Sequence, residues 1–145
     1  MLSYANVEGV YSPDRTTRWA RPLFMTSVSA GFPSPAEDYV EGRLDLNRYL
    51  IRHPVATFYV RVTGDSMAGV GIEPGSILIV DRAVEADDGD IVIARINDEL
   101  CVKRLRIGEG RIWLMPENDA YQPIEVIEGM DFEVWGRVMH AIRSY

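Results

Sequence analysis

The sequence has few of the residues on which several classes of protein depend. It contains one cysteine and two histidines, which excludes a framework of intramolecular disulfides and leaves no ligand set with zinc-site spacing. Its longest apolar runs, such as 77–80, are far too short to cross a bilayer, and the N-terminus lacks the basic-then-apolar layout of a signal peptide. We therefore expect a cytoplasmic protein that works without a metal, a cofactor or a membrane.

Lysine is the scarcest charged residue. Lys103 is the only lysine, and the other 14 of the 15 basic residues are arginines. Arginine keeps its charge in any protein environment, whereas a buried lysine can lose its proton. Acidic residues number 22, so the formal net charge is −7, which argues against a protein whose main task is to grip a phosphate backbone. Composition alone does not distinguish a role for Lys103 from chance.

The residues that are abundant suffice for a folded domain. With 145 residues, of which 47% are hydrophobic and 26% charged, the chain can fill the core of one domain of ordinary size. Residues 1–33 are rich in Ser, Thr, Pro and Gly, show no sustained period and carry a net charge of +1, against −8 for the remainder. We expect them to form a weakly structured, extended N-terminal arm that lies across an acidic body or is partly mobile.

Two short helices are predicted after this arm. Ser34 can cap a helix that has Pro35 in its first turn and Glu37 in a capping box, and we expect this helix to run to about residue 41. A second short helix is predicted over residues 45–51, before Pro54.

From residue 57 onward the pattern is that of strands and turns. Aromatic and β-branched runs separated by turn signals predict strands over residues 57–62, 76–80, 91–96, 100–105, 111–115, 124–127 and 132–142. Asn97-Asp98 lies between two of these runs and predicts a hairpin. The fold class that follows is mostly β, a compact and strongly bent sheet with short helices near the front of the chain.

Ser66 occupies a position at which a strand breaks into a turn, in Gly64-Asp65-Ser66-Met67. A serine presented there beside free backbone N–H groups meets the geometric needs of a nucleophile next to an oxyanion hole. A turn serine that hydrogen-bonds its own backbone explains the tetrapeptide alone better. A nucleophile also needs a base, and neither His53 nor His140 has an aspartate partner by spacing, so both are interpreted as surface or packing residues.

Lys103 is the remaining candidate base. Alternation along its strand puts it on one face with Cys101 and Leu105, where burial would favour the neutral amine and lower its pKa. A lysine whose stem lies along the sheet while its amine reaches water is the alternative. Cys101 has no acid–base partner by sequence and is interpreted as a small buried apolar residue. The acidic run 85–90 lacks the ligand order of an EF-hand and is interpreted as a solvated turn.

Several segments together resemble the LexA-like Ser–Lys autoproteases, and most closely the UmuD-type mutagenesis proteins of the SOS response. The segments that carry the resemblance are 30–36, 45–47, 64–67, 71–81, 89–94 and 102–105. The resemblance covers residues from about 23 to 142, which is most of the chain. The serine and lysine motifs are specific as a pair, whereas either alone would not be.

The resemblance implies a self-cleaving serine endopeptidase with a mostly β body and a mobile N-terminal arm. In such a protein Ser66 would be the nucleophile and Lys103 the general base. Backbone N–H groups of Asp65 and Ser66 would hold the oxyanion, and no metal would take part.

The resemblance also implies the substrate, which would be the Ala30–Gly31 bond of the same chain or of its dimer partner. UmuD-type proteins usually have Cys-Gly at this bond, and Ala-Gly is the LexA-like version. Cleavage would remove residues 1–30 as an arm. Residues 31–145 would remain as the autoprotease and polymerase-interaction domain.

The partners implied by the resemblance belong to error-prone DNA repair. Such proteins are usually homodimers, and a RecA–single-stranded DNA filament favours their cleavage. The shortened dimer would be the accessory subunit of a UmuC-type translesion DNA polymerase. The arm is too short for the helix-turn-helix domain of LexA-like repressors, so no sequence-specific DNA binding is expected. A LexA-like repressor fragment and a non-catalytic β interaction module are the alternatives.

Overall fold

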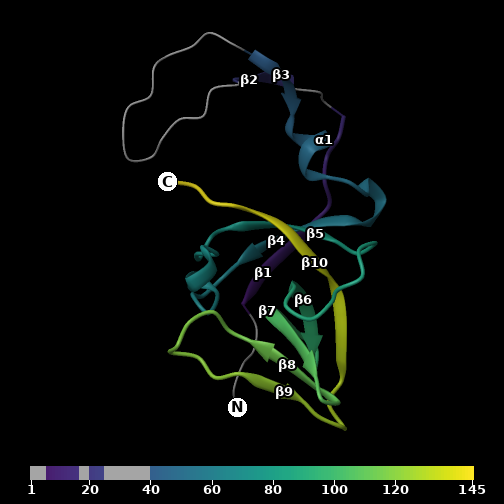
Figure 1. Ribbon diagram of the computed structural model, residues 1–145, viewed down its shortest axis with the longest axis vertical. Helices are drawn as coiled ribbons and strands as arrows, with labels where there is room; N and C mark the ends of the chain where they lie inside the picture. The colour runs from purple at the N-terminus through teal and green to yellow at the C-terminus, as the bar shows by residue number, and fades with distance from the viewer. Residues whose placement is uncertain (1–5, 17–19, 25–39) are drawn as a thin grey trace. The chain divides into compact units, whose positions relative to one another are not determined.

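The computed structural model describes residues 6–16, 20–24 and 40–145, and it is mostly β, as predicted (Figure 1). The described residues form two compact units. One contains the residues up to Pro13 together with His53–Tyr145, and the other contains the residues between Asp14 and Arg52. The predicted boundary between residues 30 and 31 falls outside the described residues and stays a prediction.

The helices that the structure describes are few and short. Among the described residues, no helix is long and apolar enough to cross a membrane.

The larger unit is built on one antiparallel sheet, which within the described residues has eight strands in the order β1-β4-β5-β10-β6-β7-β8-β9. The strands are β1 (Val7–Tyr11), β4 (Thr57–Val62), β5 (Ile77–Asp81), β6 (Ile91–Ile96), β7 (Glu99–Gly108), β8 (Arg111–Met115), β9 (Ile124–Val126) and β10 (Phe132–Ile142). The seven strands predicted from residue 57 onward are confirmed. They form because their β-branched and aromatic side chains pack well on a pleated, buried surface.

The last strand gives the sheet its bend. Residues 132–137 of β10 pair with β6, and residues 137–142 pair with β5, so one long strand joins two halves of the sheet (Figure 1). The register shifts between Val134 and Gly136 and again between Val138 and His140. Such irregularities increase the local twist of a strand, so the sheet curls rather than staying flat.

The core consists of two groups of buried side chains. The first group is Phe58, Val60, Val62, Met67, Ile72, Leu78, Val80, Ile93 and Val102. The second group is Val92, Ala94, Ile96, Cys101, Leu105 and Leu114. Strand β7 contributes Val102 to the first group and Cys101 and Leu105 to the second, as alternation predicts. Both faces of β7 are therefore buried around Lys103.

The expectation of a weakly structured arm is wrong for the described parts of residues 1–33. Strand β1 pairs antiparallel with β4, from Val7 opposite Val62 to Tyr11 opposite Tyr59. Strand β2 (Ala20–Phe24) pairs with β3 (Val40–Asp45) in a separate two-stranded sheet. Strand β1 is a short edge strand with a register shift after Val7, so it lacks the sustained alternation by which a strand is recognised.

The helix predicted over residues 45–51 is confirmed. The helix predicted from Ser34 to about residue 41 is wrong at the two residues that the structure describes. Helix α1 (Leu46–Leu50) begins after Asp45, whose side chain accepts the Asn47 N–H at 3.0 Å. Residues 40 and 41, the predicted end of the first helix, belong instead to β3, which pairs with β2. The rest of that helix lies outside the described residues. Two 3-10 turns, η1 (Pro54–Ala56) and η2 (Ala68–Val70), complete the elements.

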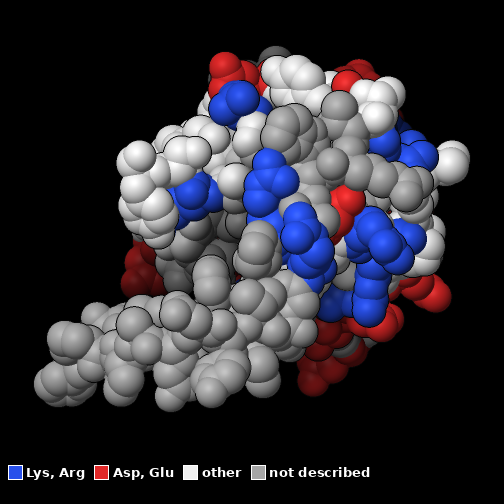
Figure 2. All heavy atoms as spheres, turned by 90° about the horizontal axis from the view of Figure 1, so that it is seen from above, with Lys and Arg blue, Asp and Glu red and all other residues white. Residues whose placement is uncertain are grey.

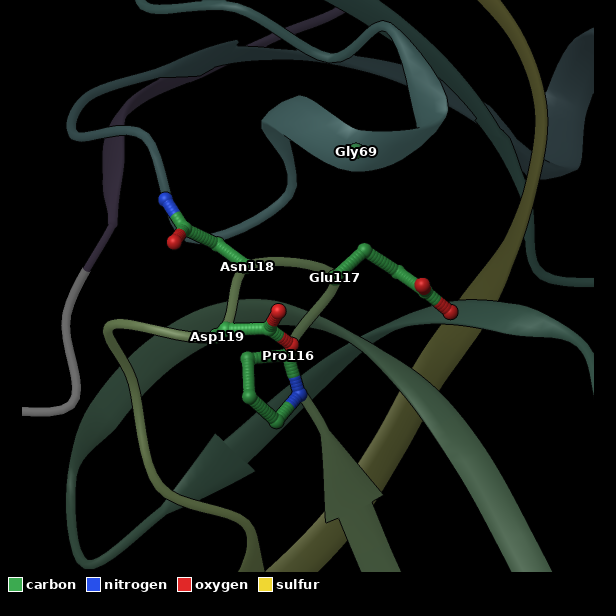
Figure 3. Close-up of a pocket in the computed structure, with 5 residues that line it drawn as sticks. All are labelled: Gly69, Pro116, Glu117, Asn118 and Asp119. Atoms are coloured by element: carbon green, nitrogen blue, oxygen red, sulfur yellow. The ribbon is translucent and has the colours of Figure 1, made fainter.

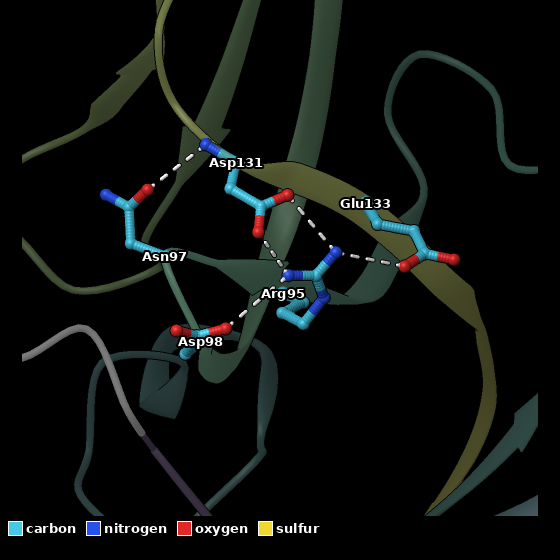
Figure 4. A network of polar contacts seen from close by, with 5 residues as sticks. All are labelled: Arg95, Asn97, Asp98, Asp131 and Glu133. Carbon is cyan, nitrogen blue, oxygen red and sulfur yellow. Dashed lines mark hydrogen bonds and ion pairs between the residues drawn. The ribbon is translucent and has the colours of Figure 1, made fainter.

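A polar network ties the β6–β7 turn to the start of β10 (Figure 4). Asn97 and Asp98 have positive φ angles of 48° and 70°, which is the conformation of a tight hairpin turn. Arg95 donates to Asp131 at 2.6 Å and to Glu133 at 3.3 Å, and its guanidinium lowers the pKa of the Asp131 carboxyl by hydrogen bonding. These groups are on the surface, so they fix the turn more than they stabilise the fold.

Candidate functional site

Ser66 lies in the turn that follows β4. Gly64 begins this turn with a φ of +71°, a conformation that L side chains rarely adopt. The Ala68 N–H then donates to the Asp65 carbonyl at 3.1 Å, which closes the turn around the serine before η2. The serine is not displayed to solvent, because it is only 3% exposed.

Lys103 reaches Ser66 from the middle of β7. Its Nζ donates a hydrogen bond to Ser66 Oγ at 2.7 Å, across 37 residues of sequence. Lys103 is 5% exposed, so the alternative of an amine that reaches water is wrong. Burial lowers the pKa of Lys103 below its usual range. A neutral amine at this distance can take the proton of the hydroxyl. We call these two residues the Ser66–Lys103 pair.

Arginines supply the exposed cationic groups, since the one lysine is buried. Arg82, Arg106 and Arg111 are exposed, and the blue groups at the surface in Figure 2 are arginine side chains. The single lysine therefore differs from the described arginines in environment as well as in chemistry.

Cys101 is buried two residues before Lys103, as predicted. Burial raises the pKa of the Cys101 thiol to about 11. The thiol is therefore protonated at neutral pH, and a protonated thiol is a poor nucleophile.

Asn6 is a contact of Ser66 that sequence reasoning missed. Its Nδ2 lies 3.0 Å from Ser66 Oγ, and the two residues are 60 positions apart in sequence. Its side chain also bonds the backbone N–H and carbonyl of Val102, the residue before Lys103. No sequence motif predicts this contact, because a single asparagine before a short strand forms no recognisable local pattern.

A loop after β8 holds the turn that carries Ser66. The Glu117 N–H donates to the Ser66 carbonyl at 2.8 Å, and the Gly69 N–H donates to the Glu117 carbonyl at 2.7 Å. Asn118 Nδ2 donates to the Asp65 carbonyl at 2.9 Å, and Tyr121 donates to the Asp65 carboxylate at 2.6 Å. These contacts fix the backbone on both sides of the serine.

The same loop lines a pocket with Gly69 (Figure 3). The side chains of Glu117 and Asn118 point away from each other in this view. This divergence matches their partners, since Glu117 pairs with Arg104 and Asn118 bonds Asp65.

The N–H groups of Asp65 and Ser66 are the predicted oxyanion donors. In the described ranges, none of the backbone hydrogen bonds of this turn uses either group as donor. Free N–H groups beside a serine are what an oxyanion hole requires. Their role stays a prediction.

The remaining candidate residues lie away from the Ser66–Lys103 pair or outside the description. His53 is half exposed and, contrary to the spacing argument, has an aspartate partner: its Nδ1 lies 2.5 Å from Asp81 Oδ2. Asp81 pairs with Thr57 at the start of β4, whereas Ser66 follows the other end of β4. His140 lies in β10, opposite Ile79. The predicted scissile residues, Ala30 and Gly31, lie outside the described residues.

Comparisons with known proteins agree with the resemblance found in the sequence. Residues 22–139 match the family model described as Peptidase S24-like. The chain is 48% identical to Protein SamA of Salmonella typhimurium over 123 residues, which are 85% of this chain and 87% of the relative. It is 43% identical to Protein ImpA of Escherichia coli over 130 residues, 90% of this chain and 88% of the relative. It is also 39% identical to the LexA repressor of Ectopseudomonas mendocina over 117 residues, 80% of this chain and 57% of the repressor.

Proposed function

The chain belongs to the peptidase S24-like family, and on that premise we propose that it is a serine endopeptidase that cleaves its own chain. Ser66 is the nucleophile, and Lys103 is the general base. The substrate is the Ala30–Gly31 bond of the same chain or of a second copy. The observation that carries the proposal is the 2.7 Å contact between Lys103 Nζ and Ser66 Oγ, two side chains that are both buried.

The reaction begins with proton transfer inside the pair. Neutral Lys103 takes the proton of Ser66 as Oγ attacks the carbonyl carbon of Ala30. The carbonyl oxygen becomes an oxyanion. The C–N bond then breaks, and protonated Lys103 returns the proton to the departing amine of Gly31. Water next attacks the acyl-enzyme ester, Lys103 takes a proton from that water, and Ser66 Oγ leaves with the proton restored.

The turn around Ser66 supports this chemistry. The N–H groups of Asp65 and Ser66 hold the oxyanion, and the loop after β8 keeps them in place through its bonds to the carbonyls of the same two residues. Donors fixed before the reaction stabilise developing charge without reorganising.

The relatives support a proposal for the wider role. We propose that cleavage is promoted by a RecA–single-stranded DNA filament in the SOS response. The shortened chain then acts as a homodimeric accessory subunit of a UmuC-type translesion DNA polymerase in the cytoplasm. The similarity to Protein SamA and Protein ImpA over most of both chains supports this branch of the family over a repressor.

One experiment tests the proposed reaction. The purified chain is incubated at mildly alkaline pH with and without RecA filament, and the products are identified by mass spectrometry and N-terminal sequencing. We expect a new N-terminus at Gly31 and faster cleavage with the filament. Ser66→Ala is expected to abolish the cut. An intact wild type under both conditions, or the same cut in Ser66→Ala, would exclude the proposal.

A further inference from the structure

Asn6 lies against the Ser66–Lys103 pair although the mechanism above gives it no task. It is 6% exposed, and its side-chain amide contacts Ser66 Oγ at 3.0 Å. An asparagine that is buried must have its donors and acceptor satisfied, so its partners define what it does.

The partners fix the orientation of the Asn6 amide. The Val102 N–H can only donate, so the group that faces it at 2.6 Å must be Oδ1. Nδ2 then faces the Val102 carbonyl at 3.2 Å as well as Ser66 Oγ. The amide thus accepts from the N–H and donates to the carbonyl of one residue. A residue of a neighbouring antiparallel strand pairs in this way through its own N–H and carbonyl.

The backbone of Asn6 docks at the same place. Its N–H donates to the Leu100 carbonyl at 3.3 Å, and its carbonyl accepts the Thr63 N–H at 2.9 Å. Leu100 belongs to β7, which carries Lys103, and Thr63 follows β4, which leads to Ser66. Asn6 therefore bridges the two elements that bring the pair together, and β1 continues from it along the edge of β4.

A scissile peptide must place its carbonyl carbon in contact with Ser66 Oγ, the atom that Asn6 Nδ2 contacts at 3.0 Å. Ser66 and Lys103 are only 3% and 5% exposed. Asn6 also occupies the backbone groups of Val102 that an extended peptide beside Ser66 would use. We propose that the segment around Asn6 is an internal competitor of the substrate, whose side-chain amide must leave before the Ala30–Gly31 bond can reach Ser66.

This inference rests on the proposed self-cleavage. It adds that a segment of the chain itself limits access to Ser66 before the cut. Asn6 is part of residues 1–30, the piece that cleavage would release. Before the cut the competitor is tethered to the site and is present at high effective concentration. After the cut it can dissociate, so the first turnover opens the site.

Asn6→Ala in the full-length chain tests the competitor. Two rates are measured at the same pH: self-cleavage after Ala30, and labelling of Ser66 by a fluorophosphonate. The label forms an Oγ–P bond and releases fluoride, while Lys103 takes the hydroxyl proton. We expect both rates to rise about tenfold, because the amide no longer holds the site closed. Slower reaction in both assays would make Asn6 a positioning residue and overturn the proposal, as would unchanged rates.

Further variants separate this effect from a change in folding. Asn97→Ala is the matched control, because Asn97 also bonds a backbone N–H through its side chain but does so in the β6–β7 turn, and we expect wild-type rates. Asn6→Leu keeps the bulk of the side chain without its hydrogen bonds and is expected to react faster than wild type, as Asn6→Ala does. Thermal melting confirms that each variant is folded at the assay temperature.

Failure of the proposed function gives a different result from failure of this inference. If wild type cleaves and is labelled but neither Asn6 variant is faster, the competitor is excluded and self-cleavage stands. If no variant is cleaved or labelled, and Ser66→Ala behaves like wild type, both proposals are overturned.

Discussion

At the scale of single residues, Lys103 differs from the arginines because its proton can be removed. Burial favours the neutral amine, and Ser66 Oγ lies 2.7 Å from it. An arginine at the same position would keep its charge and could not act as a base. Lys103→Arg is therefore expected to abolish self-cleavage while the variant still folds, which product analysis and thermal melting together would establish.

The pH dependence of cleavage follows from the direction of the Lys103 pKa shift. Only the neutral amine can accept the Ser66 proton, so the rate rises with pH through the pKa of Lys103 and then levels off. Because burial lowers this pKa, the midpoint should lie below the usual lysine value of 10.5. Single-turnover rates across the alkaline range would give the midpoint. A rate that falls with rising pH, with the protein still folded, would contradict a lysine base.

The same shift predicts a cost in stability. When the pKa of Lys103 is lower in the folded chain than in the unfolded chain, the unfolded chain binds more protons between the two values. The destabilisation is then fully present below the folded pKa and disappears as pH rises to the unfolded value. Lys103→Met should raise Tm by a few degrees at neutral pH, with a smaller gain near pH 10. Calorimetry at both pH values checks this, and a gain that grows with pH would contradict it.

Cys101 offers an independent check on burial in this part of β7. Its thiol is buried, and burial raises its pKa to about 11. We expect iodoacetamide at pH 8 to leave Cys101 unmodified in the native protein and to alkylate it after unfolding. Intact-mass measurements with and without denaturant read this out. Rapid native labelling would mean that β7 opens readily around Lys103.

The sequence identified some residues of the site and missed others for a physical reason. Ser66 stands at a strand-to-turn break, and Lys103 lies in an alternating strand, so each has a local pattern that the family resemblance then joins. Asn6 reaches Ser66 across 60 residues, and its role depends on which strand edges meet. Contacts of that kind depend on the tertiary fold and have no signal in nearby sequence.

At the scale of elements, the turn that carries Ser66 depends on a close approach to the loop after β8. A Cβ on Gly69 would lie 2.5 Å from the Glu117 carbonyl oxygen, which is backbone and cannot move alone. The Gly69 N–H donates to that same oxygen. Only glycine therefore allows the turn and the loop to meet at this distance.

Gly69→Ala is accordingly expected to displace the turn. We expect a loss of stability of about 1–3 kcal/mol, the usual cost of overpacking, together with slower self-cleavage. Gly108→Ala is the matched control, because a Cβ there meets open space and Gly108 has no positive φ. Denaturant titration and cleavage rates of both variants test this. Equal behaviour of the two variants would mean that the loop does not position Ser66.

The elements that the sequence predicts are those with their own pattern. Strands β4 to β10 have enough β-branched and aromatic residues to be recognised alone. Strands β1 and β3 form because an edge elsewhere in the chain offers hydrogen bonds, from β4 and β2 respectively. Glycine and charged residues in β1 and β3 interrupt the alternation of apolar and polar residues by which a strand is recognised. In addition, the capping signal at Ser34 favoured a helix that would extend into β3.

At the scale of the whole molecule, the proposed cut would separate β1 from β4 and β2 from β3. Residues 1–30 contain β1, which covers the outer edge of β4, and Val7 packs against the first core group. Residues 1–30 have a net charge of +1, so the remaining chain has a net charge of −8. The shortened form would thus be more acidic and would have a newly exposed sheet edge.

This exposed edge predicts a measurable difference between the two forms. Strand β4 has the sequence TFYVRV, in which Arg61 is the only charge, so its uncovered backbone and apolar groups favour pairing with another strand. Once the released peptide has been separated, we expect the shortened chain to melt about 5 °C lower at low protein concentration and to bind more hydrophobic dye. A synthetic peptide of residues 1–30 should reverse both changes, whereas a peptide with Val7 and Val10 replaced by Asp should not. Ser66→Ala is expected to stay intact, so it gives the melting temperature and dye binding of the uncleaved chain. Identical melting of the cleaved and intact chains would show that β1 contributes little to the sheet.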